Sequence, residues 1–259
     1  MKYMILSKIK SLIRILAPCL ALSGCYYLQP KTVPIGVIRY PHPEPQIAGD
    51  DKVKRLMVLL PGMGDRARVF AKHKLIAGLH DLQPSFDVIA VESHFKYYQD
   101  KSVIDRIHTD IVLPAIADGY QQIVMAGSSL GGLGSLLYLK EHPEAVSAVI
   151  VLAPYLGEVE EFQYLLDGSV RDEAAIKIDL WPWLTALPPE HQRKIFLAYG
   201  TSDKFSESNA LLSNYLPESH TLTIDGNHRW ITWKKLWPMV LCRMLMNKNV
   251  ASSCQEGGR

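Results

Sequence analysis

One serine in this chain stands between two glycines, in a spacing that suits a reactive hydroxyl. Residues 127–131 read Gly-Ser-Ser-Leu-Gly, follow the apolar run 122–126 and open a stretch with a helical pattern. At such a strand-to-helix corner the turn is so tight that the neighbours of the serine must lack bulk, and its oxygen is exposed for nucleophilic attack. We therefore predict that Ser129 is a nucleophile. Ser128 is the weaker candidate, because no glycine stands two residues before or after it.

A serine nucleophile requires a base, and two later loops could supply the base and its support. A neutral imidazole accepts the serine proton, and a carboxylate holds the imidazole in the correct tautomer and orientation. Asp203 follows the apolar run 195–199, and His228 follows the run 221–224. The carboxyl ends of parallel strands meet at one edge of a sheet, where ligands bind. We predict that Ser129, His228 and Asp203 meet there as nucleophile, base and orienting carboxylate.

Both partners of the serine have competitors in the sequence. Asp203 could instead cap the helix that follows it, since aspartate is common at that position. His228 could be an ordinary turn residue. The competing carboxylates and imidazoles are Asp179, Glu207, His220 and His94. Four other histidines, His42, His73, His80 and His191, lack the spacing of metal ligands. We therefore predict no metal site.

The elements that must position these residues alternate along the chain. Apolar runs predict strands at 56–60, 86–91, 122–126, 148–152, 194–199 and 220–224. Helical patterns cover 66–80, 102–117, 130–141, 206–216 and about 230–246. Nearly continuous apolar strands that alternate with helices indicate an α/β fold, with a mostly parallel sheet and helices on both faces. The aromatic-rich stretch 156–189 interrupts this order and predicts a small cap insertion, whose rings either line an acyl pocket or pack on the domain.

With these residues in this order, the chain resembles the α/β-hydrolase family, whose members keep the order Ser, Asp, His along the sequence. The likeness extends over about residues 56–246 and suggests the esterase branch that includes S-formylglutathione hydrolases and feruloyl esterases. The resemblance implies that the backbone N–H groups of Met63 and Leu130 form the oxyanion hole. Pro61 stands where many relatives have a histidine.

The same resemblance implies a serine hydrolase that needs no cofactor. We expect a carboxylesterase that cleaves short or medium acyl esters, with a small acyl ester as its partner and an acyl-enzyme as its intermediate. Thioesterases, lipases and peptidases share the fold, and fold alone does not choose among them. A non-catalytic lipoprotein of the cell envelope is the alternative from another class. Tryptophans at 230, 233 and 237 recur at helical spacing, which predicts that they form a stripe on one face of a helix and point into the core.

The first 24 residues have the pattern of a secretory signal. Four basic residues and no acidic ones precede the apolar run 15–22, which leads to Ser-Gly-Cys at 23–25. Residues 22–25 resemble the lipobox of bacterial lipoproteins, which implies cleavage before Cys25 and lipid attachment to it. The alternatives are a plain secretory signal and an uncleaved anchor helix, for which the apolar run is short.

These features divide the chain into a signal peptide (1–24), a proline-rich tether (25–53) with one edge strand at about 35–40, and a hydrolase domain (54–259). Two or more acyl chains on Cys25 would anchor the protein stably to a bilayer. Tyr26 stands where retention in the inner membrane of Gram-negative bacteria usually goes with aspartate. The resemblance therefore implies the outer membrane, with the domain facing the periplasm.

Charge and cysteine usage limit the remaining partners. Loss of the four basic signal residues would change the formal net charge from +2 to −2. Since no polybasic patch remains, we expect no nucleic-acid partner. Cys242 and Cys254 are left over after the signal and the lipidated residue, and in an oxidising compartment they could form a disulfide. Alternatively, Cys242 is buried and Cys254 is an unpaired residue of a polar tail.

Overall fold

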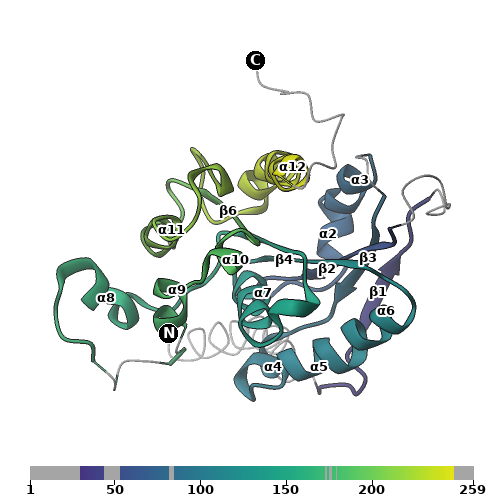
Figure 1. Ribbon diagram of the computed structural model, residues 1–259, viewed down its shortest axis with the longest axis horizontal. Helices are drawn as coiled ribbons and strands as arrows, with labels where there is room; N and C mark the ends of the chain where they lie inside the picture. The colour runs from purple at the N-terminus through teal and green to yellow at the C-terminus, as the bar shows by residue number, and fades with distance from the viewer. Residues whose placement is uncertain are drawn as a thin grey trace, which may run out of the picture.

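A single sheet forms the centre of the structure, a computed structural model that describes residues 30–43, 53–81, 85–172, 174, 177–178 and 180–247. Its seven strands lie in the order β1-β3-β2-β4-β5-β6-β7 (Figure 1). Neighbouring strands are parallel except for β1, which runs antiparallel to β3. The strands are β1 (Val37–Tyr40), β2 (Arg55–Leu60), β3 (Asp87–Val91), β4 (Gln122–Ser128), β5 (Ala148–Leu152), β6 (Ile195–Gly200) and β7 (Thr221–Ile224).

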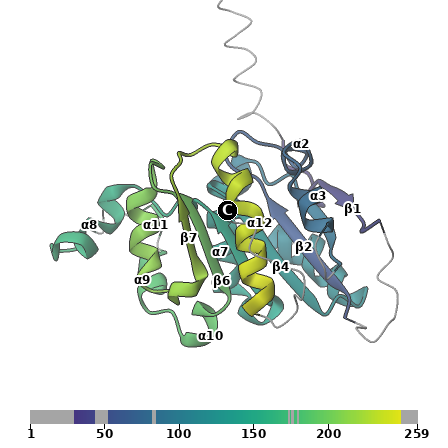
Figure 2. The same cartoon turned by 90° about the horizontal axis from the view of Figure 1, so that it is seen from above.

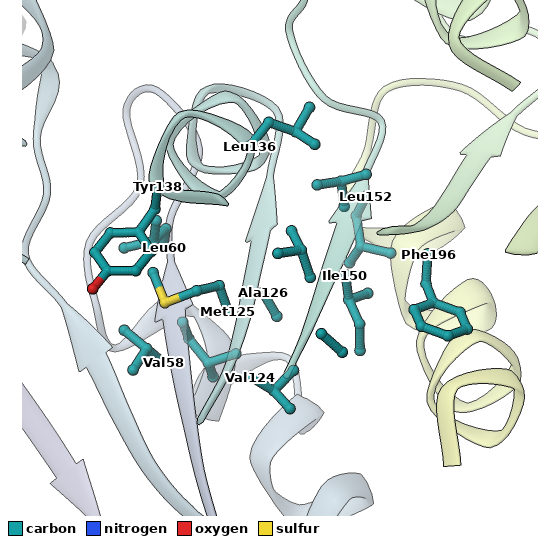
Figure 3. Packing of buried hydrophobic residues seen from close by; sticks show 14 of the residues in the cluster. Val58, Leu60, Val124, Met125, Ala126, Leu136, Tyr138, Ile150, Leu152 and Phe196 are labelled. Carbon is teal, nitrogen blue, oxygen red and sulfur yellow. The ribbon is translucent and has the colours of Figure 1, made fainter. Parts of the chain in front are cut away.

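The six parallel strands form where the apolar runs predict them, to within two residues. Every residue of β2, β5 and β6 is buried, as expected for strands covered on both faces. β1 lies at the predicted edge strand, so part of the predicted tether belongs to the sheet. Figure 3 shows part of the core around β4, with Met125 beside Val58 of the adjacent strand β2, and with Leu136 and Tyr138 on the helix that follows.

Helices cover both faces of the sheet (Figure 1), which confirms the predicted α/β architecture. Figure 2 shows the C-terminal helix α12 lying across one face. The helices on that face are α12 (Trp230–Asn247), α2 (Val69–Lys72) and α3 (Leu75–His80). Those on the other face are α7 (Leu130–Glu141), α4 (Phe95–Gln99), α5 (Val103–Ile107) and α6 (Leu113–Ala117). α11 (Ser206–Ser213) packs beside β6, and short helical segments are α10 (Pro189–Gln192), η2 (Pro143–Ala145) and η3 (Glu218–His220).

The predicted helix 66–80 is wrong as one element, because it is divided into α2 and α3 at Lys74. Lys74 has a left-handed backbone (φ 63°), and its carbonyl accepts the Gly78 N–H at 3.0 Å as α3 begins. The indole N–H of Trp237 donates to the Leu75 carbonyl at 2.9 Å, which ties the start of α3 to α12. The periodicity of apolar residues carries no information about such a tertiary contact. The sequence pattern therefore predicts one continuous helix across the break.

The predicted helix 102–117 is continuous in direction but changes its winding. A π-helical segment, η1 (His108–Val112), joins α5 to α6. Pro114 follows at the start of α6 and has no N–H to donate to the carbonyl of residue 110. A wider turn directly before the proline accommodates this missing hydrogen bond.

The insertion between β5 and β6 contains α8 (Val159–Asp167) and α9 (Trp181–Thr185). α8 lies at the periphery of the molecule in both views (Figures 1 and 2). The buried carboxylate of Glu161 accepts backbone N–H groups of residues 158, 177 and 178 at 2.8–3.1 Å. Trp181 is buried, packs on Phe162 and donates its indole N–H to the Leu156 carbonyl at 2.8 Å. These two aromatic rings therefore pack against each other within the insertion, an arrangement that differs from both predicted roles.

Candidate active site

The backbone at Ser129 makes a sharp corner between β4 and α7. β4 ends at Ser128, α7 begins at Leu130, and Ser129 itself has φ 52° and ψ −117°, a conformation that L-residues rarely adopt. Its N–H donates to the Leu152 carbonyl at 2.9 Å, and its carbonyl accepts the N–H groups of Leu133 and Tyr155 at 3.1 Å each. Neighbouring elements on both sides thus hold the strained residue in place.

Two glycines make this corner sterically feasible. A Cβ atom on Gly127 would lie 2.1 Å from the carbonyl oxygen of Gly131. A Cβ atom on Gly131 would lie 2.0 Å from the carbonyl oxygen of Leu60, at the end of the adjacent strand β2. Since non-bonded carbon and oxygen atoms do not approach so closely, neither position accepts a side chain without movement of backbone. The two glycines that flank the predicted nucleophile are therefore required by the geometry of the turn.

The next two glycines let α7 pack closely. A Cβ atom on Gly132 would lie 2.9 Å from Cβ of Pro154, and one on Gly134 would lie 2.5 Å from the Tyr98 hydroxyl oxygen. Their small size keeps the first turns of the helix slim, as the sequence pattern predicts. This close packing fixes the direction in which the helix leaves the corner.

The structure brings Ser129, His228 and Asp203 together at the carboxyl edge of the sheet. His228 Nε2 lies 2.9 Å from Ser129 Oγ, and His228 Nδ1 lies 2.9 and 2.8 Å from the two carboxylate oxygens of Asp203. Asp203 is buried three residues after β6, and one of its oxygens also accepts the Phe205 N–H at 2.9 Å. Because a carboxylate only accepts, Nδ1 carries the hydrogen of the neutral ring and Nε2 is left as the acceptor for the serine hydroxyl.

Aromatic rings hold the imidazole in this orientation. Phe205 and Trp233 each contact the His228 ring edge to face, with centroid distances of 4.8 and 4.9 Å. The imidazole is partly buried, whereas the Asp203 side chain is fully enclosed. Rings on two sides restrict rotation of the imidazole, so its Nε2 stays directed at the serine.

The competing residues occupy other places. His220 is buried, with Nδ1 at 3.0 Å from the Ile195 carbonyl oxygen and its ring stacked on Phe196 at 4.2 Å. His94 precedes α4 and contacts the Tyr97 ring at 4.6 Å, and burial lowers its pKa. Glu207 is exposed on α11, and Asp179 lies outside the described residues. The hydrogen bonds of His228 go to Ser129 and Asp203 instead.

The loop after β2 lies beside the serine. Its turn is closed by a hydrogen bond from the Asp65 N–H to the Gly62 carbonyl at 3.1 Å, and the indole N–H of Trp230 donates to Asp65 Oδ2 at 2.9 Å. That second bond ties the loop to the start of α12, 165 residues away. Met63 on this loop and Leu130 at the first position of α7 are the predicted oxyanion donors. Because N–H groups in the first turn of a helix have no partner within that helix, the Leu130 N–H suits this role.

Comparison with known families decides the class of the protein. The family model described as "Putative esterase" matches residues 92–241, more than half of the 259 residues. The chain belongs to this esterase family. It is therefore a carboxylic ester hydrolase, and its predicted identity as a serine esterase of the α/β-hydrolase type is confirmed.

Solved structures similar to the esterase share its fold. A ferulic acid esterase superposes with a TM-score of 0.57 at 16% identity, covering 77% of this chain and 87% of that one. Est1E from Butyrivibrio proteoclasticus superposes with a TM-score of 0.56 at 14% identity, covering 82% of this chain and 96% of that one. An S-formylglutathione hydrolase from Staphylococcus aureus gives 0.52 at 15% identity, also with coverage of 82% and 96%. Comparison with curated protein sequences gave no match.

A cavity of about 320 Å³ opens at the serine of the esterase. It is lined by Gly62, Met63, Asp65, Ser129, His228, Arg229, Trp230 and Trp233. Burial raises the pKa of Asp65, while its hydrogen bond from Trp230 acts in the opposite direction. These lining residues come from the loop after β2, the elbow, the loop between β7 and α12, and the first turn of α12. None of the described residues of the insertion at 156–189 is among them.

The sequence pattern assigns no role in the cavity to five of its lining residues: Gly62, Asp65, Arg229, Trp230 and Trp233. The tryptophan stripe is predicted to face the core, and Trp233 and Trp237 are indeed buried, yet Trp230 is half-exposed and lines the cavity together with Trp233. No motif in the sequence marks Asp65 or Arg229. Their only signal was position, since one lies in the predicted oxyanion loop and the other directly follows the predicted base.

Several remaining predictions fall outside this site. Cys25 and Cys254 lie outside the described residues, whereas Cys242 lies in α12 and is disulfide-bonded. In the part of the chain that the structure describes, no helix has the length and hydropathy of a membrane span. Across the same described ranges, no cluster of three or more His, Cys, Asp or Glu side chains is arranged to hold a metal ion.

Proposed function

We propose that the esterase cleaves carboxylic esters of short or medium acyl chains, with Ser129 as nucleophile, His228 as general base and acid, and Asp203 as orienting carboxylate. The observation that carries this proposal is the continuous hydrogen-bonded series from Ser129 Oγ through the imidazole to the buried carboxylate, with every distance at 2.8–2.9 Å. A nucleophile, a base within hydrogen-bond reach and a third group that orients the base together fit covalent catalysis.

The proposed reaction has two stages. In the first, Ser129 Oγ attacks the ester carbonyl while His228 Nε2 takes its proton, and the imidazolium then protonates the departing alcohol. In the second, His228 takes a proton from water, hydroxide attacks the acyl-enzyme, and the acid leaves as the proton returns to Ser129. The N–H groups of Met63 and Leu130 would stabilise the negative oxygen at each stage, and removal of one such donor costs about 2.7–4 kcal/mol in other enzymes.

The size of the cavity supports the expected acyl length. About 320 Å³ is near the lower end of the range for small-molecule sites, so the cavity suits a small ester as a whole. We expect kcat/KM to be highest for acetyl or butyryl esters and to fall for octanoyl and dodecanoyl esters of one phenol. The measurement uses the full chain in detergent, beside a thioester and a peptide.

A dodecanoyl optimum would contradict the proposed acyl length while leaving the ester class intact. Faster turnover of the thioester or peptide than of every oxygen ester would contradict the reaction class. Each outcome therefore bears on a separate part of the proposal.

We further propose that the protein is a lipoprotein attached through Cys25 to the outer membrane, with its domain in the periplasm. The support is the sequence alone: basic residues, a short apolar run and the Leu-Ser-Gly-Cys pattern at 22–25. Cys25→Ser is expected to abolish incorporation of labelled palmitate, because the thiol is the first lipid attachment point. Cys19→Ser, a cysteine within the same signal, is the matched control and should still be labelled.

Labelling that persists in Cys25→Ser would exclude this attachment site. Separation of inner and outer membranes by density then tests the location. A labelled protein found in the inner membrane would contradict the outer-membrane assignment alone.

A further inference from the structure

Arg229 places a positive charge in the cavity beside the predicted base. Its side chain is exposed and lines the cavity together with Ser129 and His228. Among the described residues, no carboxylate forms an ion pair with its guanidinium and no acceptor binds it. An arginine that lines a cavity without a protein partner keeps its five donors available for a ligand.

The backbone of Arg229 is fixed even though its guanidinium forms no hydrogen bond or ion pair with the described residues. Its N–H donates to the Asn227 carbonyl at 2.8 Å, and its own carbonyl accepts the N–H groups of Thr232 and Trp233 at 3.0 and 3.2 Å. These bonds begin α12, so the Cα position of Arg229 is set by the same turn that presents His228. The guanidinium is therefore carried by a backbone position directly beside that of His228, and it lines the same cavity.

Asp65, the carboxylate that lines the same cavity, is already engaged. It accepts the Trp230 indole N–H at 2.9 Å, and the positive charge of Lys72 acts on it. His73 stacks on Trp230 at 4.5 Å, and burial, together with the charges of Lys72 and Lys234, lowers its pKa, so at neutral pH this ring adds no positive charge. Asp65 and Arg229 are the carboxylate and the guanidinium in the cavity lining, and since Asp65 is bound by Trp230 and not by Arg229, the guanidinium favours an anionic group in the cavity.

The chemistry of the proposed reaction indicates which part of the ester would meet Arg229. His228 Nε2 must return its proton to the departing alkoxide, so the alcohol portion of the ester lies beside the imidazole. Arg229 follows His228 directly in the chain and lines the same cavity. An anionic group carried on the alcohol portion would therefore lie within reach of the guanidinium.

We propose that Arg229 is a specificity-determining residue that binds an anionic group, such as a carboxylate, on the leaving alcohol of the ester. This inference rests on the proposed function, because it requires ester cleavage at Ser129. Arginine suits the role, since its planar guanidinium can donate two parallel hydrogen bonds to one carboxylate. The Trp230 and Trp233 rings beside it would accommodate an apolar or aromatic spacer between the ester oxygen and the anion.

Two acetyl esters that differ in one charge test this inference. The first is 4-acetoxybenzoate, whose leaving phenol carries a carboxylate, and the second is its neutral methyl ester. The quantity measured is the ratio of kcat/KM for the acetyl group of the charged ester to that of the neutral one. A ratio cancels any effect of a substitution that both esters share, such as a small shift of the imidazole.

With the full chain in detergent, we expect Arg229→Gln to lower this ratio about tenfold and Arg229→Glu to lower it further, while Arg229→Lys keeps part of it. Higher ionic strength should lower the wild-type ratio, because an exposed charge is screened. Arg193→Gln is the matched control. Arg193 is exposed, has no side-chain partner in the described part of the chain and lies just before the amino end of β6, at the edge opposite to the site.

An equal ratio in wild type and Arg229→Gln would overturn the inference, and so would a ratio that Arg193→Gln lowers as much. If the neutral ester is hydrolysed and Ser129→Ala abolishes that hydrolysis, such a result leaves the proposed function standing. If neither ester is hydrolysed, or Ser129→Ala hydrolyses both, the proposed function and this inference fail together.

Discussion

Ser129→Ala is expected to lower ester turnover by at least about a thousandfold. The methyl group that replaces the hydroxymethyl group leaves His228 Nε2 without the oxygen that lies 2.9 Å away, so no acyl-enzyme can form. In other serine hydrolases, loss of a triad member lowers kcat by about 10⁴ to 10⁶. The measurement is kcat for an acetyl ester, with circular dichroism to show that the variant is folded.

Ser128→Ala is the matched control for this substitution. Ser128 is buried at the end of β4, and its hydroxyl is not hydrogen-bonded to any of the described residues. Removal of an unpartnered buried hydroxyl should leave turnover within a few-fold of wild type. Turnover that survives in Ser129→Ala and is lost in Ser128→Ala would reverse the assignment of the nucleophile.

Gly131→Ala is expected to disrupt the corner that presents the serine. The added Cβ would lie 2.0 Å from the Leu60 carbonyl oxygen, which is backbone of a central strand and cannot rotate away. We expect a loss of about 3 kcal/mol in the free energy of unfolding, which corresponds to a fall in Tm of about 6 to 12 °C. Turnover should fall as well, because relief of the overlap moves the elbow away from the imidazole.

Gly78→Ala is the control, since a Cβ at that helical position meets no atom within 4 Å. Alanine favours a helix over glycine by about 0.8–1 kcal/mol, so Tm should stay the same or rise slightly. Calorimetry of the two variants gives the comparison. If the Gly131→Ala protein had the Tm and the ester turnover of wild type, the glycine would not be required by the turn.

The three residues of the proposed triad could be placed from sequence because of a rule of topology. Each follows an apolar strand, and in a parallel sheet all such strands end at the same edge. Ser129, Asp203 and His228 are separated by up to 99 residues along the chain, yet the order of strands brings them within hydrogen-bond distance. A residue's position after a strand was therefore enough to predict the neighbourhood, without knowledge of any side-chain contact.

The wall of the cavity could not be predicted in the same way. Its two tryptophans lie in the first turn of α12, and which side of a helix faces a cavity depends on the rotation of that helix on the sheet. The spacing of the tryptophans places them on one face of α12. That face lines the cavity at Trp230 but is buried in the core at Trp237, about two helical turns later. Likewise, no local pattern pairs Asp65 with Trp230, because their hydrogen bond spans 165 residues.

Irregular segments form a second class of features that the sequence pattern does not contain. The insertion is organised by the buried carboxylate of Glu161, which accepts three backbone N–H groups from two separate segments. The periodicity of apolar residues predicts helices and strands. It does not predict a side chain that accepts hydrogen bonds from backbone N–H groups in place of backbone carbonyls. The order of the regular elements was thus predictable, whereas the short helices α4, α8 and α9 were not.

The most direct test of the nucleophile is to identify the residue that a serine-directed reagent modifies. The full chain is treated with a biotin-linked fluorophosphonate, digested and mapped by mass spectrometry. An activated serine beside a neutral imidazole attacks phosphorus, so we predict one adduct, on Ser129, that is absent from Ser129→Ala and present in Ser128→Ala. An adduct on another serine, or no adduct on a folded wild-type protein, would contradict the assignment of Ser129 as the nucleophile.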